Sequence, residues 1–289
     1  MLRLFTDTDC DITPSMAKEM GLSLISMPYA IDGKNIEPYV DFETFDAHAF
    51  YDVLRGGVLP TTSAVSEERY IEYFEPVFAA GDDIFYIHFS AAMSMTFGNM
   101  EKAVARLQQK YPERKFWHID TRGISALAAL IVMEVADMVH EGKTPDEIVA
   151  WSESNLDHYA MYFLADDLKF FKRSGRVSGL TATMGTLIGV RPIIFMNDEG
   201  KMVSCGKERG RQKAIDHIVN KVVELGDDVK NHRIILSHTD AYDFLDDMVN
   251  GLKEKLGDDI NLIILDCNPA AGSHCGPNGI GMAFHAIHK

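Results

Sequence analysis

The sequence contains few basic residues for its length. Lysine and arginine together number 28, against 43 aspartates and glutamates, which gives the 289-residue chain a formal net charge of −15 at pH 7. Nucleic acids and anionic membranes are polyanions, so they repel a strongly acidic protein. We therefore expect neither nucleic acid nor an anionic membrane as a partner.

Cysteines are also scarce, and their spacing excludes the common zinc motifs. The four cysteines, at positions 10, 205, 267 and 275, include no C-x-x-C pair. We expect no bound metal, no cofactor, and thiols kept reduced as in the cytoplasm. A disulfide between Cys267 and Cys275 is an alternative, because the two lie close together in the sequence.

Long apolar runs are missing as well. No run approaches the roughly 20 residues that a membrane-spanning helix requires. The first residues, MLRLF, are typical of a strand and lack the regions of a signal peptide. We therefore expect a cytoplasmic protein that is not integral to the membrane.

Several motifs of nucleotide-binding and hydrolytic enzymes are absent. The chain has no G-x-x-x-x-G-K-[ST] and no H-E-x-x-H; residues 123–127 lack the last glycine of a nucleophile elbow, and residues 279–284 the last glycine of G-x-G-x-x-G. A Ser-His-Asp triad would have to be assembled from distant residues such as Ser90, His274 and Asp7. Hydrolysis is therefore the less favoured interpretation.

What the chain does contain is an alternation of short apolar runs and amphipathic stretches. The apolar runs predict strands at residues 2–5, 24–29, 84–89, 115–120, 159–164, 192–196, 201–204, 233–236 and 262–265. Amphipathic stretches predict helices at residues 42–54, 67–78, 96–111, 124–140, 209–225 and 241–256, and another that begins near residue 145. This order predicts an α/β fold with a parallel sheet in the N-terminal half.

The length and a change of character near Asp157 predict two domains, residues 1–157 and residues 158–289. In the second domain, residues 166–191 begin as an amphipathic helix, turn at Ser174-Gly175-Arg176 and continue through small residues. A helix that starts after such a turn would present free N–H groups to an anion. The alternative is an ordinary packed pair of helices.

Hydroxyl groups follow the predicted strands of the first domain or begin its helices. These residues are Thr62, Ser63, Ser90, Ser94 and Thr121. Ligands of parallel α/β sheets bind beyond the carboxyl ends of the strands, so the placement predicts a binding site. The alternative is that the hydroxyls cap helices.

Together with an imidazole, His274, and two arginines, Arg176 and Arg209, these hydroxyls suit an anionic head group with an apolar tail. Uncharged donors can bond a carboxylate without burying a full counter-charge. Apolar residues of the C-terminal half could enclose the tail at about 0.8 kcal/mol per methylene, or form the ordinary core. They are Met161, Phe163, Phe170, Phe171, Leu187, Ile193 and Phe195.

Three alternating acids, Asp7, Asp9 and Asp11, follow the first predicted strand. A haloacid-dehalogenase-type phosphatase carries D-x-D in this position, although that motif requires Thr or Val where Asp11 stands. An EF-hand loop is excluded, because Ile12 and Lys18 occupy its glycine and glutamate positions. The favoured interpretation is a strand-to-helix loop with capping carboxylates.

Five motifs in the same order resemble the DegV family of bacterial fatty-acid-binding proteins, which includes the binding subunits of fatty acid kinase. The segment TDTDCD resembles T-D-S-x-x-D, TSAVS resembles T-S-Q-P-S, and HFSAAMSMT resembles H-x-S-S-x-L-S-G-T. The segment DLKFFKRSGRVS resembles D-L-x-x-L-K-K-G-G-R-I-S, and GSHCGPNG resembles G-x-H-x-G-P-G. The resemblance spans essentially the whole chain.

The resemblance implies two α/β domains, with a long acyl chain such as palmitate buried in a tunnel of the C-terminal domain. It implies that Thr62, Ser90 and His274 hold the carboxylate at the domain interface. Arg176 and Arg209 match basic positions near the head group or a kinase-docking face. In kinase-associated members the protein is not itself a catalyst and presents the carboxylate to a separate kinase.

The chain departs from the family pattern at four positions. Ala91 replaces a head-group serine, Met95 and Ser174 replace glycines, and Asn278 replaces the last glycine of G-P-G. Losing the hydroxyl at position 91 would cost about 1 kcal/mol. A binding protein for a different anion, or an Asp-dependent phosphatase, is therefore an alternative function.

Overall fold

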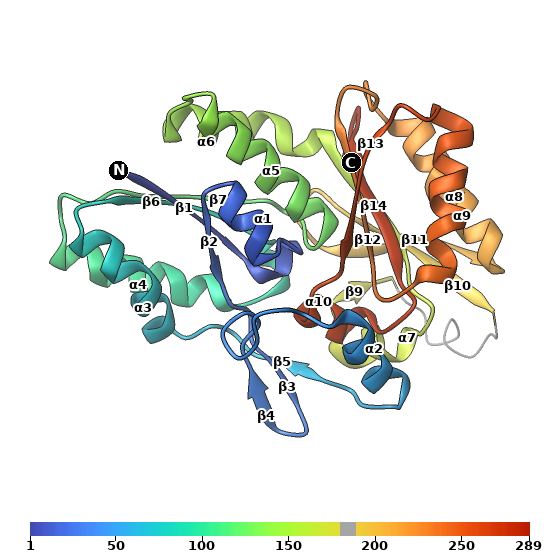
Figure 1. Ribbon diagram of the computed structural model, residues 1–289, viewed down its shortest axis with the longest axis horizontal. Helices are drawn as coiled ribbons and strands as arrows, with labels where there is room; N and C mark the ends of the chain where they lie inside the picture. Colours follow the sequence, from blue (N-terminus) through green and yellow to red (C-terminus); the bar gives the residue numbers. More distant parts are fainter. Residues whose placement is uncertain (180–188) are drawn as a thin grey trace.

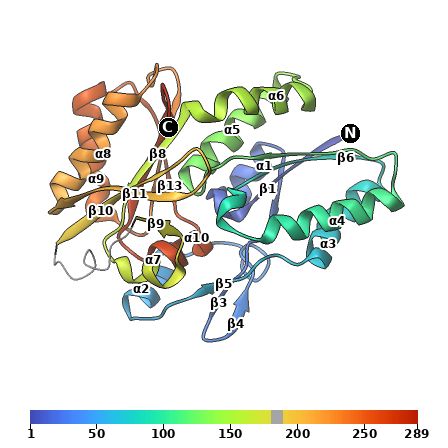
Figure 2. The ribbon, with the colours of Figure 1, turned by 180° about the vertical axis from the view of Figure 1, so that it is seen from behind.

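The computed structural model describes residues 1–179 and 189–289. These residues form an N-terminal sheet, a larger C-terminal sheet and a small third sheet (Figures 1 and 2). Among them, no helix is both long and apolar enough to cross a membrane.

The N-terminal sheet is parallel throughout, with the order β2-β1-β6-β7. Its strands are β1 (Leu2–Asp7), β2 (Leu22–Ile25), β6 (Asp83–His88) and β7 (Phe116–Asp120). Residues 84–87 of β6 are an unbroken apolar run, as expected of a strand that is buried on both faces. Helices α3 (Glu67–Ala79) and α4 (Thr96–Lys110) cover one face, while α5 (Ala126–His140) and α6 (Pro145–Asn155) lie on the other (Figure 1).

The C-terminal sheet is mixed and has the order β13-β12-β14-β8-β10-β11-β9. Its strands are β8 (Tyr159–Leu164), β9 (Val177–Ser178), β10 (Val190–Met196), β11 (Met202–Arg209), β12 (Arg233–His238), β13 (Asn261–Asp266) and β14 (Ile280–His285). Helices α8 (Arg211–Leu225) and α9 (Tyr242–Leu256) pack together on its outer face. The predicted mixed α/β fold with a parallel N-terminal sheet is thus confirmed.

Helix α5 is the layer that the two large sheets share. Its residues are buried on nearly every side, and it packs against β12, β14 and β8 as well as β6. A helix that is apolar all round is suited to such a fully enclosed position. One apolar core contains residues of both sheets, among them Phe85 and Phe163. The predicted boundary near Asp157 falls in the short helix η3 (Leu156–His158), where the chain passes between the sheets, and the division into two domains stays a prediction.

A segment between β2 and α3 crosses to the C-terminal half. It forms the small sheet of β3 (Tyr29–Ile31), β4 (Lys34–Ile36) and β5 (Thr61–Thr62), together with helix α2 (Ala47–Arg55). In Figure 1, α2 lies beside α10 (Pro269–Cys275) and α7 (Leu168–Ser174). The Tyr51 hydroxyl donates to the Cys267 carbonyl at 2.8 Å, and Gly272 permits this approach because a Cβ there would stand 2.4 Å from the Tyr51 oxygen.

Several elements differ from the sequence expectations. The predicted strand 24–29 is wrong: β2 ends at Ile25 and β3 begins only at Tyr29, so residues 26–28 belong to neither strand. The predicted helix 209–225 begins only at Arg211, because Arg209 pairs with Val190 as the end of β11. Helix α10 and strand β14 were not predicted. The helix expected beyond the Ser174-Gly175-Arg176 turn falls largely on residues 180–188, outside the described residues.

Candidate ligand-binding site

A cavity of about 260 Å³ lies between the two large sheets. Most of its wall is apolar and comes from both halves of the chain, including Met27, Phe89, Met161, Phe163, Ala271 and Ile280. Phe89 directly follows β6, at the carboxyl end of the parallel sheet, where ligands of such sheets bind. The wall therefore suits an apolar ligand body held between the halves.

One end of this cavity carries a hydroxyl–imidazole pair. The Thr62 hydroxyl, on β5, and His274 Nε2, on α10, lie 2.9 Å apart. Burial lowers the pKa of His274 to about 4, and the nearby charges of Arg176 and Arg173 add to this effect. The imidazole is therefore neutral at pH 7, and its Nδ1 has no hydrogen-bond partner among the described residues. A neutral pair of this kind can bond a carboxylate without an enclosed counter-charge.

Three other predicted site residues also line the cavity: Ser63, Ser94 and Arg176. The Ser94 oxygen accepts from the Thr96 amide at 3.2 Å, which leaves its hydroxyl proton available to a ligand. Arg176 is exposed, and its guanidinium donates to the Ser174 carbonyl at 2.7 Å. Arg176 thus places a positive charge at the cavity wall without being enclosed by it.

The remaining predicted residues, Ser90, Ala91 and Arg209, are not among the described residues that line the cavity. The buried Ser90 hydroxyl donates to the Gly200 carbonyl at 2.8 Å, so it fastens the β10–β11 turn to the end of β6. Ala91 is exposed, and its amide donates to the Asp120 carboxylate at 3.3 Å. Arg209 is an exposed residue of β11.

Of the apolar residues predicted to enclose a tail, some line the cavity and others belong to the core. Met161 and Phe163 line the cavity. Ile193 belongs to the core of the outer layer, and Phe195 packs against that core; Phe170 and Phe171 belong to other core clusters. Leu187 lies outside the described residues. Met95, a departure from the family pattern, lines the cavity and is 88% exposed, so it stands at the cavity's open side.

The first aspartate of the N-terminal loop, Asp7, is fully enclosed. Its carboxylate accepts from the amides of Phe89 at 3.0 Å and Asp9 at 3.1 Å, and from the Tyr86 hydroxyl at 3.1 Å. Burial raises the pKa of Asp7 to about 7, and these three hydrogen bonds oppose the rise. The side chain caps the loop and has no exposed surface, which disfavours it as the nucleophile of a phosphatase.

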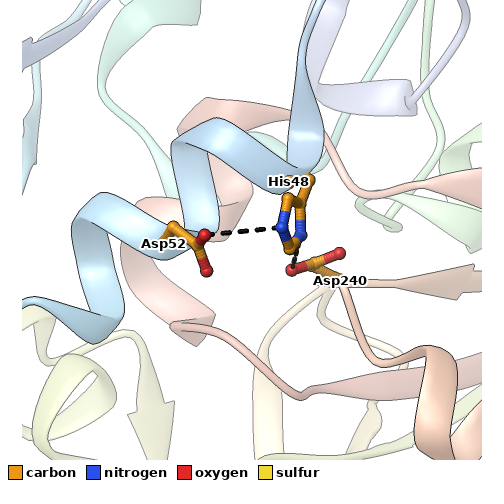
Figure 3. Close-up of side chains that lie close together, drawn as sticks. All are labelled: His48, Asp52 and Asp240. Carbon is orange, nitrogen blue, oxygen red and sulfur yellow. Dashed lines mark hydrogen bonds and ion pairs between the residues drawn. The ribbon is translucent and has the colours of Figure 1, made fainter.

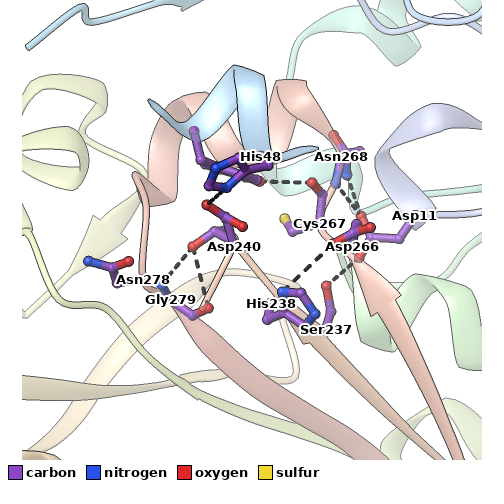
Figure 4. Close-up of polar contacts among 12 residues, drawn as sticks. Asp11, His48, Ser237, His238, Asp240, Asp266, Cys267, Asn268, Asn278 and Gly279 are labelled. Carbon is purple, nitrogen blue, oxygen red and sulfur yellow. Dashed lines mark hydrogen bonds and ion pairs between the residues drawn. The ribbon is translucent and has the colours of Figure 1, made fainter. Parts of the chain in front are cut away.

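The third aspartate, Asp11, joins distant segments of the chain (Figure 4). Its carboxylate accepts from the Ser125 hydroxyl, from the Ser237 hydroxyl at 2.7 Å, and from the Asn268 amide and side chain at 2.9 and 2.7 Å. The partners stand at the beginning of α5, at the end of β12 and at the beginning of α10. Sequence reasoning missed this role because none of the partners is near in sequence.

Among the described residues, His48, Asp52 and Asp240 form the one group of three whose spacing would suit a metal ion (Figure 3). His48 Nδ1 lies 2.9 Å from Asp240, but the other ring nitrogen faces Asp52 at 3.4 Å, so a single ion cannot use both nitrogens. The guanidinium of Arg55 also donates to the same Asp240 oxygen at 2.5 Å. We interpret the group as an ion-pair network that holds α2 against the loop after β12.

The cysteines remain thiols. All four are free, so the alternative of a Cys267–Cys275 disulfide is not realised. Both line the cavity, and burial raises the pKa of Cys275 to about 12. Burial also raises the pKa of Cys267 well above its ordinary value, so neither thiol is a nucleophile at neutral pH.

The fold defines an α/β protein with two large sheets and a cavity between them. A sequence model described as an uncharacterised protein of the DegV family matches residues 1–286. A DegV domain-containing protein of Clostridium perfringens is 30% identical over 282 residues, 97% of this chain and 96% of the relative. The chain belongs to the DegV family, as its motifs predicted.

Solved structures show the same fold. A DegV family protein from Eubacterium eligens, loaded with heptadecanoic acid, matches with a TM-score of 0.85 at 20% identity and covers 99% of this chain and 100% of that one. A stearic acid-binding protein from Eubacterium ventriosum matches with a TM-score of 0.84 at 18% identity, with 98% and 97% covered. These likenesses extend over the whole architecture.

Proposed function

We propose that the protein binds a long-chain fatty acid, with its carboxylate at Thr62 and His274 and its chain in the cavity. The observation that carries this proposal is the neutral hydroxyl–imidazole pair at one end of an apolar cavity. The family members from Eubacterium eligens and Eubacterium ventriosum, which share the fold, are described with heptadecanoic acid and stearic acid.

The two ends of the cavity would contribute differently to affinity. Burying the chain provides about 0.8 kcal/mol per methylene and is indifferent to the head group. The head group is selected by hydrogen bonds from Thr62 and His274, with Ser63, Ser94 and the positive charge of Arg176 at the same wall. A ligand must therefore have both parts to bind well.

We further propose that residues 1–157 supply the hydroxyl-bearing loops and residues 158–289 most of the chain-binding wall. The protein would not be a catalyst itself and would present the carboxylate to a separate kinase, for which the exposed Arg176 beside the cavity and the exposed Arg209 on β11 are docking candidates. We place it in the cytoplasm because its cysteines are unpaired.

The first test is organic extraction of the freshly purified protein and mass spectrometry of the extract. A near-stoichiometric long-chain fatty acid is expected. An anion of another class would favour the alternative of a different ligand. An empty extract, with no uptake of added palmitate or oleate, would contradict the proposal.

The second test measures the head-group contact by titration of delipidated protein with palmitate. Thr62→Val removes the hydroxyl at nearly constant volume and should raise Kd about tenfold, the value of one lost hydrogen bond. Thr61→Val is the matched control, since Thr61 precedes it on the same strand, is exposed and is not among the residues that line the cavity. Equal affinities of the two variants would refute the assignment of Thr62.

A further inference from the structure

The second aspartate of the N-terminal loop, Asp9, differs from its neighbours in facing the cavity. It lies in the short helix η1 (Thr8–Cys10), is 7% exposed and lines the cavity wall. Its Oδ1 atom is buried and has no hydrogen-bond partner among the described residues. Asp7 and Asp11, by contrast, use their carboxylates in three and four hydrogen bonds respectively. Asp9 is therefore the one aspartate of this loop whose carboxyl is available to bond a ligand inside the cavity.

The protonation state of Asp9 fits a neutral partner. Burial raises the pKa of Asp9 well above its ordinary value, and the neighbouring carboxyls of Asp7 and Asp11 raise it further. A neutral carboxylic acid has one O–H donor and an acceptor oxygen. Such a group is suited to a ligand hydroxyl, which also donates and accepts, and gives no special attraction to a cation.

Two more hydroxyls accompany Asp9 on the wall. Ser125 and Ser237 line the cavity and lie 3.0 Å apart, and both are bonded to Asp11. The Ser125 amide donates to the Asp9 carbonyl at 2.7 Å, which holds the two residues side by side. This polar stretch of Asp9, Ser125 and Ser237 stands in a wall that also carries apolar side chains, among them Phe89 and Ile124.

The polar stretch lies away from the head-group end. Helix α10 begins at Asn268, which bonds Asp11, and reaches His274, which contacts Thr62. Six residues of helix rise about 9 Å, a span of at least six carbon–carbon bonds of about 1.5 Å. A fatty acid anchored at Thr62 and His274 would thus bring the middle of its chain, not its first carbons, to Asp9.

A plain hydrocarbon chain and a hydroxylated one would meet this wall differently. Methylenes laid over Asp9 would exclude water and leave the buried acid without a partner, which is unfavourable. A hydroxyl at the same place would give the Asp9 carboxyl a hydrogen-bonding partner. We propose that the preferred ligand is a long-chain fatty acid with a hydroxyl in the middle of its chain, received by Asp9 beside Ser125 and Ser237. This inference rests on the proposed function.

The test compares the affinities of delipidated protein for three acids: stearate, stearate with a hydroxyl on the tenth carbon, and stearate with a hydroxyl on the second carbon. Wild-type protein should bind the tenth-carbon hydroxy acid about tenfold more tightly than stearate, the value of one completed buried hydrogen bond. The second-carbon isomer should have no such advantage. Asp9→Leu should abolish the preference, while Asp9→Asn, which still donates and accepts, should retain most of it.

The outcomes separate this inference from the function on which it rests. Binding of stearate with no preference for the mid-chain hydroxyl would overturn the inference and leave fatty acid binding intact. A preference unchanged in Asp9→Leu would also overturn it, because the hydroxyl would then be recognised elsewhere. Failure of the wild-type protein to bind any of the three acids would overturn both. Even if Asp9→Leu does not fold, the wild-type comparison alone can overturn the inference.

Discussion

The carboxylate of Asp11 is one of the points at which the two halves of the molecule are hydrogen-bonded together, and among the described residues it is a buried one. It is 4% exposed and accepts four hydrogen bonds from Ser125, Ser237 and Asn268. Figure 4 shows the contacts with Ser237 and Asn268. Asp11 belongs to the loop after β1, whereas Ser237 and Asn268 belong to the C-terminal sheet and to α10. We therefore expect its removal to destabilise the whole protein and not a single element.

The perturbation is Asp11→Ala. Four buried donors lose their acceptor at about 1 kcal/mol net each, with some of the loss recovered by rotation of the serine hydroxyls. Residue 11 also has φ of 58°, a left-handed conformation that costs alanine roughly 1 kcal/mol more than aspartate. We expect the free energy of unfolding to fall by about 4 kcal/mol.

Asp11→Asn is the matched control. Asparagine tolerates the left-handed backbone, its carbonyl can accept both Asn268 donors, and its amide can donate to serine hydroxyls that rotate to accept. Burial raises the pKa of Asp11 toward the protonated form, which an amide imitates. We expect this variant to lose only about 1–2 kcal/mol.

Urea unfolding followed by far-ultraviolet circular dichroism measures both values, and an unchanged m-value would indicate that the native state stays compact. Fluorescence of Trp117 and Trp151, both in the N-terminal half, provides a second probe of the same transition. A loss below about 0.5 kcal/mol for Asp11→Ala, no more than a typical surface substitution, would refute the reasoning. So would an equal loss for Asp11→Asn.

Three further predictions concern the parts of the chain that surround the cavity. Arg55→Met leaves the buried Asp240 carboxylate without its guanidinium partner and should lower the midpoint of urea unfolding by an amount equivalent to about 1–2 kcal/mol. An unchanged midpoint would contradict the interpretation that this ion-pair network holds α2 against the loop after β12. Gly272→Ala places a methyl against the Tyr51 ring and should cost about 2 kcal/mol in thermal unfolding, whereas an unaffected Tm would mean that α2 is free to shift. His274 has a folded-state pKa of about 4, below the ordinary 6.5, so between these values only the unfolded chain binds its proton and stability falls as the pH falls, by about 3 kcal/mol in all. His274→Asn should lack that part of the pH dependence, and parallel stability curves for the two proteins would contradict the shift.

The elements that the sequence predicted well are those with local signals. Helix α3 begins after Ser66, whose hydroxyl accepts from the Arg69 amide, and α6 begins with a capping box at Thr144. These signals depend only on residues three positions apart. The continuous apolar runs of β6 and β8 likewise identify strands buried on both faces.

The elements that were missed depend on distant partners. Strand β14 contains Gly281, which weakens the strand pattern but is needed because a Cβ there would stand 2.3 Å from the Phe163 Cβ of neighbouring β8. The apolar residues 280–284 were a usable signal. Helix α10 is short and glycine-containing, and it is supported by contacts with α7 and α2 that the local sequence does not indicate.

The site stays a proposal, and the contacts among its candidate residues could be predicted only in part for the same reason. Thr62 and His274 stand in family motifs, and the structure brings them into contact although they are 212 residues apart. Ser90 stands in an equally good motif, but its hydroxyl donates a hydrogen bond to the Gly200 carbonyl. No local sequence pattern reveals this contact. Asp9 is the opposite case. It reads as one of several capping acids, and only the packed structure shows that its oxygen has no partner.

The proposed head-group end of the cavity is formed only while the segment of β3, β5 and α2 is docked on the C-terminal half. Thr62 is carried by that segment and His274 by α10, and the same docking is held by Tyr51 at Cys267 and by Arg55 at Asp240. A ligand bonded to both Thr62 and His274 favours the docked arrangement by RT ln(1 + [L]/Kd). By the same linkage, each interaction that holds α2 in place contributes to ligand affinity, because it lowers the free energy needed to bring Thr62 and His274 together. The crossing segment is therefore part of the proposed binding site, even where its side chains lie outside the cavity.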